Sequence, residues 1–431
     1  MSKTDIASVF AWEALDSRGR PTVAARVTLA GGATGRAVAP SGASTGSHEA
    51  KERRDGGPRY GGRGVLAAVA AVNGAIAEAV IGLDAADQRK VDGTMEALDG
   101  EKSLGRLGAN AALSVSLAVL LAAAEAQREP LWRMLNGGAP PLIPMPMVNI
   151  FSGGAHAGQL LDIQDILAMP LGADSFRQAI EWVSRVRSAT ADLLNAQGLS
   201  SALVADEGGL AAPLKGNEAA LRLVTAGIEK AGFRPGEDVG VAIDIASNQL
   251  LREGRYALAV DGVEFAASDW IAEVARWCAL YPIVSLEDVV GEDQWADWRT
   301  ASEILGRNRQ LVGDDLFATN AERLARGVAS GIANAVLVKV NQAGTVSRAE
   351  TVVTKARAAG YATVVSARSG DTEDYWLADL AVGWRAGQIK VGSTQRSERT
   401  AKWNRLLEIE ADPQNDARFA GRKALGANDG A

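Results

Sequence analysis

The sequence predicts an α/β protein in which a barrel of repeated strand–helix units follows a smaller α+β domain. The first observation is a series of short apolar runs between residues 241 and 390, each ending in a charged residue. Such runs are typical of strands buried on both faces of a parallel sheet, and helical patterns separate them. The terminal charged residues are Asp244, Glu287, Asp314, Lys339, Arg368 and Lys390.

The second observation is a proline-rich connection at residues 137–146, where the prolines cannot lie inside a helix or a central strand. It divides the chain into a predicted N-terminal α+β domain, residues 1–138, and a predicted barrel, residues 139–431. Apolar patterns in the first domain predict an antiparallel meander of three strands, at 6–12, 22–29 and 34–39. Helical patterns follow at 65–81, 85–98 and 110–127.

The second part begins with strands expected at 147–151 and 162–168 and helices expected at 175–197 and 217–231. Strand–helix units then continue to residue 390, and an amphipathic helix expected at 397–410 would pack outside the barrel. In such a barrel the C-terminal strand ends meet at one mouth, where catalytic residues come from several strands. Three carboxylates and two lysines are therefore expected to lie close together.

Composition narrows the class of protein. A net charge of −7 argues against nucleic acid or an anionic membrane as a partner. The single cysteine, Cys278, excludes an internal disulfide and fits a cytoplasmic protein, and its helical pattern favours a buried structural thiol over a nucleophile. The start of the chain lacks the apolar core of a signal peptide. The most apolar segment, 111–124, is shorter than the roughly 20 residues needed to cross a bilayer, so we expect a buried helix.

The three acids at successive strand ends, Asp244, Glu287 and Asp314, are candidate metal ligands. Carboxylates brought together repel one another unless a cation neutralises them. Oxygen-only ligands without a cysteine or histidine cluster favour magnesium over zinc. The alternative is that each acid caps a neighbouring helix, which is less expected for three strand ends in a row.

Lysines and a further acid are candidates for proton transfer. Lys339 would lie beside the acids, where a bound cation and a partly dry surrounding disfavour its charged form and make it usable as a base. The alternative is a lysine that pairs with the carboxylates in place of a metal. Lys390 would either neutralise a substrate's charge or pair structurally. Glu207 lies among glycines in Asp206-Glu-Gly-Gly209 and is a candidate general acid, although the same residues also make an ordinary exposed turn.

Glycine loops supply the remaining candidates. His156 lies in Ser152-Gly-Gly-Ala-His-Ala-Gly158, from which it could reach a bound anion, whereas His48 is expected to be solvated. The loop Ser41-Gly-Ala-Ser-Thr-Gly46 resembles a phosphate-cradling loop but lacks the Gly-Lys-Ser/Thr ending of a nucleotide P-loop. Arg368 and Ser369 follow a strand end and could hold a phosphate.

A series of motifs, ordered over nearly the whole chain, resembles the enolase (phosphopyruvate hydratase) family. The motifs are Pro40-Ser-Gly-Ala-Ser-Thr-Gly46, Val204-Ala-Asp-Glu-Gly-Gly209, Ser285-Leu-Glu-Asp288, Gly313-Asp-Asp-Leu-Phe317, Lys339-Val-Asn-Gln342, Arg368-Ser-Gly370 and Gln388-Ile-Lys390. The resemblance implies the enolase fold, in which a small α+β domain precedes a modified TIM-like αβ barrel, usually in a dimer.

The resemblance also implies roles for individual residues. It assigns one Mg²⁺ to the three acids above and a second Mg²⁺ to a site that involves Ser41. It makes Lys339 the base that removes the proton α to the carboxylate of 2-phosphoglycerate, and Glu207 the group that helps the C3 hydroxyl leave as water. The residues implied to bind substrate are His156, Gln164, Asp165, Arg368, Ser369 and Lys390.

Two positions depart from the family pattern. Enolases have Ser-His-Arg-Ser-Gly where this chain has Ser366-Ala-Arg-Ser-Gly370, so Ala367 replaces a histidine that contacts substrate. Enolases have Ile-Gln-Glu-Phe where this chain has Ile163-Gln-Asp-Ile166, so Asp165 replaces a glutamate one methylene longer. Both changes are expected to widen the substrate pocket and remove polar partners.

We therefore expect a Mg²⁺-dependent dehydratase of the enolase family that acts on a small phosphorylated or phosphonylated carboxylic acid. The altered pocket favours a 2-phosphoglycerate analogue with an extra substituent on phosphorus, such as the carboxyphosphono analogue that yields carboxyphosphonoenolpyruvate in phosphonate antibiotic pathways. The alternatives are a housekeeping enolase and a non-catalytic binding or scaffold protein. We expect a cytoplasmic homodimer or higher homo-oligomer that binds neither nucleic acid nor membrane.

Overall fold

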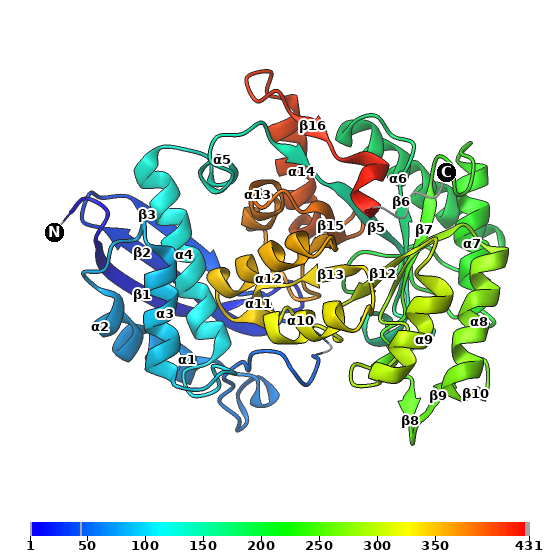
Figure 1. Cartoon of the computed structure of the whole chain (residues 1–431), viewed down its shortest axis with the longest axis horizontal. Helices are drawn as coiled ribbons and strands as arrows, with labels where there is room; N and C mark the ends of the chain where they lie inside the picture. The colour runs from blue at the N-terminus through cyan, green and yellow to red at the C-terminus, as the bar shows by residue number, and fades with distance from the viewer. Residues whose placement is uncertain (1, 44, 427–431) are drawn as a thin grey trace.

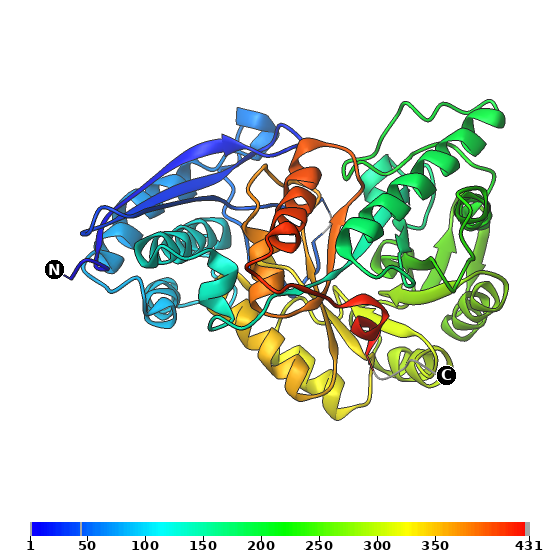
Figure 2. The ribbon, with the colours of Figure 1, turned by 90° about the horizontal axis from the view of Figure 1, so that it is seen from above.

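The computed structural model describes residues 2–43 and 45–426 of the chain. An N-terminal part of three strands and several helices, blue to cyan in Figure 1, lies beside a larger barrel drawn in green to red. Figure 2 gives the same arrangement from above. The predicted domain boundary at residue 138 falls between helix α5 (Leu131–Leu135) and the first strand of the second part, β4 (Leu142–Ile143).

The N-terminal sheet is the expected antiparallel meander. Its strands are β1 (Ile6–Leu15), β2 (Pro21–Leu29) and β3 (Thr34–Val38). Helices cover one face of it, and their bounds are α1 (Leu66–Ala71), α2 (Ala77–Val80), α3 (Gln88–Asp99) and α4 (Ala109–Gln127). The single helix expected at 65–81 is instead interrupted by one π-helical stretch, Val72–Ile76, between α1 and α2.

Helix α4 corrects one step of the sequence argument. The helix has 19 residues and a mean hydropathy of 1.6, so by length and composition alone it could cross a membrane. Within the fold 83% of its most apolar window is buried, and it packs against β2 and β3. The expected buried helix is confirmed, but its burial, and not a short length, identifies it as a core helix.

Eight strands close the barrel. They are β5 (Met145–Ser152), β6 (Asp165–Met169), β7 (Gly240–Asp244), β11 (Ile283–Glu287), β12 (Gln310–Gly313), β13 (Ala335–Val338), β14 (Ala362–Ser366) and β15 (Gly387–Gly392). The order around the barrel is β11-β12-β13-β14-β15-β5-β6-β7. Apolar side chains such as Met147, Leu167 and Leu337 fill its interior, so only the mouth is open to a ligand.

Strand β6 departs from the simple parallel barrel, because it runs antiparallel to both of its neighbours, β5 and β7. The connection after β5, which the structure describes throughout, contains only the 3₁₀ helix Gly154–Ala157 and no α-helix that could cross over the sheet, so the chain returns antiparallel to β5. As a result, the first residue of β6, Asp165, pairs with the last residue of β7, Asp244. The antiparallel strand therefore delivers its N-terminal end to the mouth.

Helices pack around the barrel. Their bounds are α6 (Phe176–Ala196), α7 (Asn217–Lys230), α8 (Ala267–Leu280), α9 (Trp295–Leu305), α10 (Ala321–Ala329), α11 (Val340–Ala343), α12 (Val346–Ala358), α13 (Trp376–Gly383) and α14 (Ser397–Ala411). A side sheet of β8 (Leu251–Arg252), β9 (Arg255–Leu258) and β10 (Val263–Phe265) precedes α8, and β16 (Arg418–Phe419) pairs with β4. Cys278 is buried in α8, as expected, and burial raises the pKa of its thiol to about 11.

Gly35 tests how closely the N-terminal sheet packs on α4. A Cβ atom at this position of β3 would collide with the backbone at Ala118 and Ala122 of the helix. We expect Gly35→Ala to lower the free energy of unfolding by about 1–3 kcal/mol, since a packed interface must be forced apart. Gly93→Ala in α3 is the control, because a Cβ there meets no atom within 4 Å and alanine favours a helix. Equal stability of the two variants in urea unfolding would contradict the prediction.

Candidate active site

The charged strand ends meet at the barrel mouth, in the order that the strands impose. Around the ring they are Asp314 after β12, Lys339 after β13, Arg368 after β14, Lys390 in β15, Asp165 at the start of β6, Asp244 at the end of β7 and Glu287 at the end of β11. All but Lys339 are buried, and the Lys339 side chain keeps only 12% exposure. A small cavity opens among them, lined by Ala43, His156, Gln164, Glu207, Asp244, Lys339, Ser366, Ala367, Arg368, Ser369 and Lys390.

Lys390 reaches across the mouth to the opposite strands. Its Nζ lies 2.7 Å from Asp244 Oδ2 and 2.8 Å from Glu287 Oε2. Burial alone would lower the pKa of Lys390, but the two carboxylates outweigh it and hold that pKa well above its usual value. The ammonium is therefore charged and contacts two of the three acids.

Lys339 pairs with the third acid, Asp314. Here too burial opposes the charged form, but the attraction of Asp314 raises the pKa of Lys339. Gln342 Nε2 donates to the other oxygen of Asp314 at 2.9 Å, and Thr319 joins this network by donating to Gln342 Oε1 at 2.7 Å. In this arrangement the lysines pair with the carboxylates, which is the alternative that the sequence left open.

The mouth nevertheless holds more negative than positive charge. Burial and the neighbouring Asp244 raise the pKa of Glu287 well above its usual value, even though Lys390 touches its carboxylate. The two ammonium groups thus do not neutralise the three acids, and a proton or another cation must supply the balance. This excess of buried, oxygen-only donors fits a divalent cation such as Mg²⁺.

The ligand atoms of the three predicted metal ligands are not yet gathered around one point, because Lys390 and Lys339 lie between them. Among the described residues, three other groups place acid or histidine ligand atoms within 4.8 Å of one another. They are His48 with Glu292 and Asp293, His156 with Asp165 and Glu207, and Asp288 with Asp314 and Asp315. In the last group Asp288 accepts the backbone N–H groups of both neighbouring acids, at 3.0 and 2.7 Å, and so fixes the turn after β12.

His156, Asp165 and Glu207 form a second charged cluster at the mouth. His156 Nδ1 lies 2.8 Å from Asp165 Oδ2, and Nε2 lies 3.8 Å from Glu207 Oε1. Burial opposes the imidazolium, but Asp165 and Glu207 outweigh it and raise the pKa of His156 to about 9. Asp165 also accepts from Ser152 and Asn149 and lies behind His156, outside the cavity lining. Its predicted contact with substrate stays a prediction.

Arg368, the predicted phosphate ligand, is held by the N-terminal domain. Its Nη1 donates to Glu49 Oε2 at 2.9 Å and to Asn341 Oδ1 at 2.9 Å. Burial would lower the pKa of Arg368, but Glu49 more than compensates and raises it. Arg18, from the same domain, donates to Ser369 Oγ at 3.1 Å. Arg368 and Ser369, the two residues predicted to bind phosphate, are therefore both held by contacts from the first 135 residues.

Gln164 and Ser41 have different surroundings. Gln164 lines the cavity, and its Nε2 donates to Asp244 Oδ2 at 3.1 Å; its contact with substrate stays a prediction. The Ser41 hydroxyl instead donates to Glu52 at 3.2 Å and accepts from Arg54 at 3.0 Å. It is not brought to the carboxylates in this arrangement, so its role in a second metal site stays a prediction. His48, expected to be solvated, is exposed, and its Nε2 lies 3.0 Å from Asp293 Oδ1.

The sequence argument assigned no role to Glu49, Gln342 or Asp288. Gln342 and Asp288 belong to motifs that carry the resemblance, so their position in the sequence was a usable signal. Glu49 had no such signal, because no local pattern marks it and it meets Arg368 only through the tertiary fold.

A closed αβ barrel with buried acids and lysines at its mouth defines the class of TIM-like barrel proteins whose sites lie at the C-terminal strand ends. Comparison with family models gives a match to the enolase N-terminal domain over residues 6–135. A second match, to the enolase C-terminal TIM barrel domain, covers residues 141–428. The chain belongs to the enolase family and has the enolase fold.

The pKa of His156 provides a direct test of the second cluster. Asp165→Asn removes the largest favourable charge on the imidazolium, so we expect the pKa of His156 to fall from about 9 toward its usual 6.5. The sequence has only two histidines, so ¹H–¹⁵N NMR titration separates them. Asp269→Asn, at an exposed position of α8, is the control. A His156 that already titrates near 6.5 in the unmodified protein would refute the described contacts.

Proposed function

We propose that the protein is a Mg²⁺-dependent hydro-lyase that eliminates water from a 2-phosphoglycerate analogue. The observation that supports this most strongly is the separation of two proton-transfer groups across the barrel mouth. Lys339 follows β13, and the cluster of His156, Asp165 and Glu207 gathers around β5 and β6, with β6 four strands from β13 in the ring. A substrate between them would meet a base on one side and an acid on the other.

The proposed chemistry assigns each proton. Lys339 Nζ, once unprotonated, takes the proton from the carbon α to the substrate carboxylate. Glu207 gives a proton to the hydroxyl on the next carbon, which leaves as water as the carbon–carbon double bond forms. Arg368 and Ser369 would hold the phosphorus group, since a guanidinium suits phosphate geometry. Lys390 and Gln164 would face the carboxylate end.

Asp244, Glu287 and Asp314 would hold Mg²⁺, with Ser41 proposed for a second ion. When bound, Mg²⁺ neutralises the carboxylates that raise the pKa values of the two lysines and stabilises the dianion that proton abstraction creates. The lysine pairing described above would give way to these ligands, because the same carboxylates cannot serve both.

The specialised substrate rests on Ala367. Its methyl group lines the cavity at the position where the family pattern has histidine, next to Arg368. The smaller side chain leaves room beside the phosphorus group, which favours the carboxyphosphono analogue and its product, carboxyphosphonoenolpyruvate. A housekeeping enolase that makes phosphoenolpyruvate is the second candidate, favoured by the intact set of acids and lysines. The same set argues against a non-catalytic scaffold.

We also propose that the protein works in the cytoplasm as a homodimer or higher homo-oligomer. A lone buried cysteine supports a reducing compartment. Phe10 and Leu15 support self-association, because these large apolar side chains of β1 are 51% and 54% exposed.

Magnesium binding should be measurable without turnover. Excess Mg²⁺ is expected to stabilise the protein by about 2.7 kcal/mol at 100 times the dissociation constant, which appears as a higher unfolding temperature. Glu287→Gln should lose most of this gain because it removes a ligand charge, whereas Glu303→Gln, exposed on α9, should keep it. Equal Mg²⁺ stabilisation of both variants would contradict the assigned metal site.

The activity itself is tested by following Mg²⁺-dependent formation of the enol product from 2-phosphoglycerate and from its carboxyphosphono analogue. We expect turnover of the analogue to exceed that of 2-phosphoglycerate, and Lys339→Ala to reduce it by about 10²- to 10⁴-fold, the usual contribution of a general base. Efficient turnover of 2-phosphoglycerate would establish the housekeeping candidate instead. No turnover of either compound, together with no Mg²⁺ binding, would support the scaffold.

The variant Ala367→His distinguishes an enzyme whose pocket is adapted to another substrate from an enzyme that is simply slow on 2-phosphoglycerate. If the pocket is adapted to a larger group, restoring the imidazole should raise activity on 2-phosphoglycerate and lower it on the analogue. An unchanged ratio of the two activities would contradict the role given to Ala367.

A further inference from the structure

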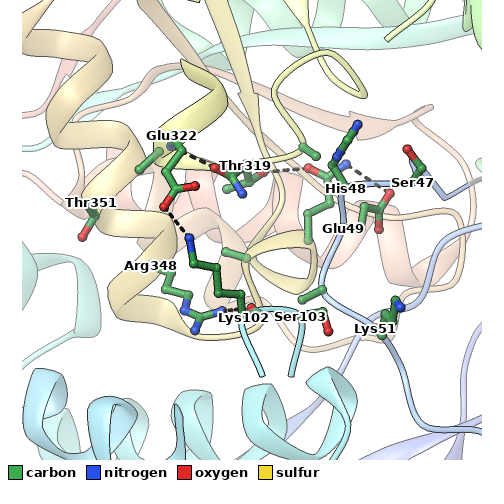
Figure 3. Close-up of a pocket in the computed structure, with 16 residues that line it drawn as sticks. Ser47, His48, Glu49, Lys51, Lys102, Ser103, Thr319, Glu322, Arg348 and Thr351 are labelled. Carbon is green, nitrogen blue, oxygen red and sulfur yellow. Dashed lines mark hydrogen bonds and ion pairs between the residues drawn. The ribbon is translucent and has the colours of Figure 1, made fainter. Parts of the chain in front are cut away.

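A second cavity, of about 450 Å³, lies between the N-terminal domain and the barrel, outside the candidate active site (Figure 3). The N-terminal domain contributes residues 47–51 and 102–103 to its wall, and the barrel contributes residues at α10, α11 and α12. A space of this size at a domain boundary is typical of a small-molecule site.

The chemistry of the wall selects a class of ligand. Four alanine methyl groups, from Ala50, Ala318, Ala321 and Ala343, give it an apolar part. Around this part lie three cationic side chains from three separate segments, Lys51, Lys102 and Arg348. Hydroxyl groups such as those of Ser103 and Thr351 add hydrogen-bond donors. The combination suits a small anion with an apolar portion.

Two of the three cations, Lys51 and Lys102, can turn to a ligand at little cost. Lys51 makes no ion pair in the part of the chain that the structure describes. Lys102 pairs with Glu322 at 2.9 Å, but these side chains are 90% and 78% exposed, and such surface pairs contribute little. Arg348 is anchored on Glu96 at 3.0 Å and on the carbonyl of Lys102, which holds its guanidinium at the wall.

Acidic side chains do not cancel this preference. Glu322 is engaged by Lys102, and the carboxylate of Glu49, the other acid of the wall, pairs with Arg368. After these pairs and the Arg348–Glu96 pair are counted, Lys51 remains as a wall cation without an ion pair among the described residues.

Two wall residues also contact the active site. Glu49 holds Arg368, and Gln342 donates to Asp314, the partner of Lys339. Glu49 also accepts from the Gly46 N–H at 3.0 Å, at the end of the loop that carries Ser41. A ligand that fixes the segment 47–51 against the barrel would therefore fix Glu49 on Arg368.

We propose that this cavity is an effector site for a small organic dianion, a dicarboxylate or a phosphate monoester. The ligand joins wall segments of both domains and holds Glu49 on Arg368. Because the substrate's phosphorus group needs the same guanidinium, occupation of the cavity raises the KM for substrate. Linkage requires the reverse as well, so substrate weakens binding of the effector. Only this coupling rests on the proposed function; the binding site does not.

Binding is tested on the full chain with succinate and with glycerol 3-phosphate. The two histidines report the two sites separately, because His48 lines this cavity and His156 lines the active site. We expect saturable shifts of the His48 ring signals in ¹H–¹⁵N NMR at concentrations that leave His156 unchanged. Shifts of His156 alone, or of neither ring, would overturn the proposal. A preference for one probe identifies which anionic group the site favours.

Charge variants test the same site by calorimetry. Lys51→Gln combined with Arg348→Gln should weaken probe binding about tenfold or more, the equivalent of one lost charge-assisted contact. Lys215→Gln combined with Arg299→Gln, at exposed positions, is the matched control. Equal affinities of the two double variants would overturn the assignment.

The coupling is measured on the active enzyme. Each probe should raise the KM for substrate and leave kcat nearly unchanged, and Glu49→Gln should still bind the probe but lose this effect. Probe binding without any change in KM would refute the coupling. If the enzyme turns over neither substrate, the NMR and calorimetric results still show whether the cavity binds the probes. Failure of the proposed function can therefore be distinguished from failure of the proposed effector site.

Discussion

The buried negative charge at the barrel mouth is the constraint on which the rest of the site depends. Asp244, Glu287 and Asp314 are each at most 6% exposed, and desolvation would drive them to take up protons unless cations are near. Lys390 and Lys339 meet part of this demand, and the raised pKa of Glu287 shows that they do not meet all of it. Such a cluster persists only in a fold rigid enough to oppose its own repulsion.

The closed barrel provides that rigidity. Each acid lies at the end of a strand, and backbone hydrogen bonds join that strand to a neighbouring strand on either side. The pairing of Glu287 with Asp244 across β11 and β7 places two carboxylates side by side at adjacent strand ends. Asp288, next in the chain, fixes the third by accepting the N–H groups that follow β12. Backbone geometry thus holds charges together that would separate in a flexible loop.

Much of this arrangement could be predicted, because it follows from local patterns. Apolar runs that end in Asp244, Glu287, Asp314 and Lys339 identify strands and place their last residues at one mouth, and the structure agrees. The same rule does not apply to Asp165, which begins its strand, because β6 runs in the opposite direction. That reversal depends on how the chain returns after β5, which apolar periodicity does not encode.

The pairing of Glu49 with Arg368 was also beyond local reasoning. The two residues are 319 positions apart, and neither has a pattern that marks the other. The pair is buried, so breaking one side would leave an unpaired charge, which costs far more than losing a surface contact. Glu49 lines the proposed effector cavity and Arg368 lines the candidate active site, so a contact that sequence patterns do not reveal is the one that joins the two sites.

The two domains therefore divide the work unequally. The barrel supplies the acids and lysines, and few substitutions among them would keep their charges balanced. The N-terminal domain supplies Glu49 and Arg18, which position Arg368 and Ser369, the residues proposed to hold the phosphorus group of the substrate. Ala367 lies beside Arg368 in the lining of the same cavity. A change of the proposed substrate would be tolerated there, because replacing an uncharged side chain beside Arg368 leaves the charge balance of the three acids intact. In the proposed reaction, electrostatics would thus constrain proton transfer, and a few contacts at the domain boundary would decide which substrate fits.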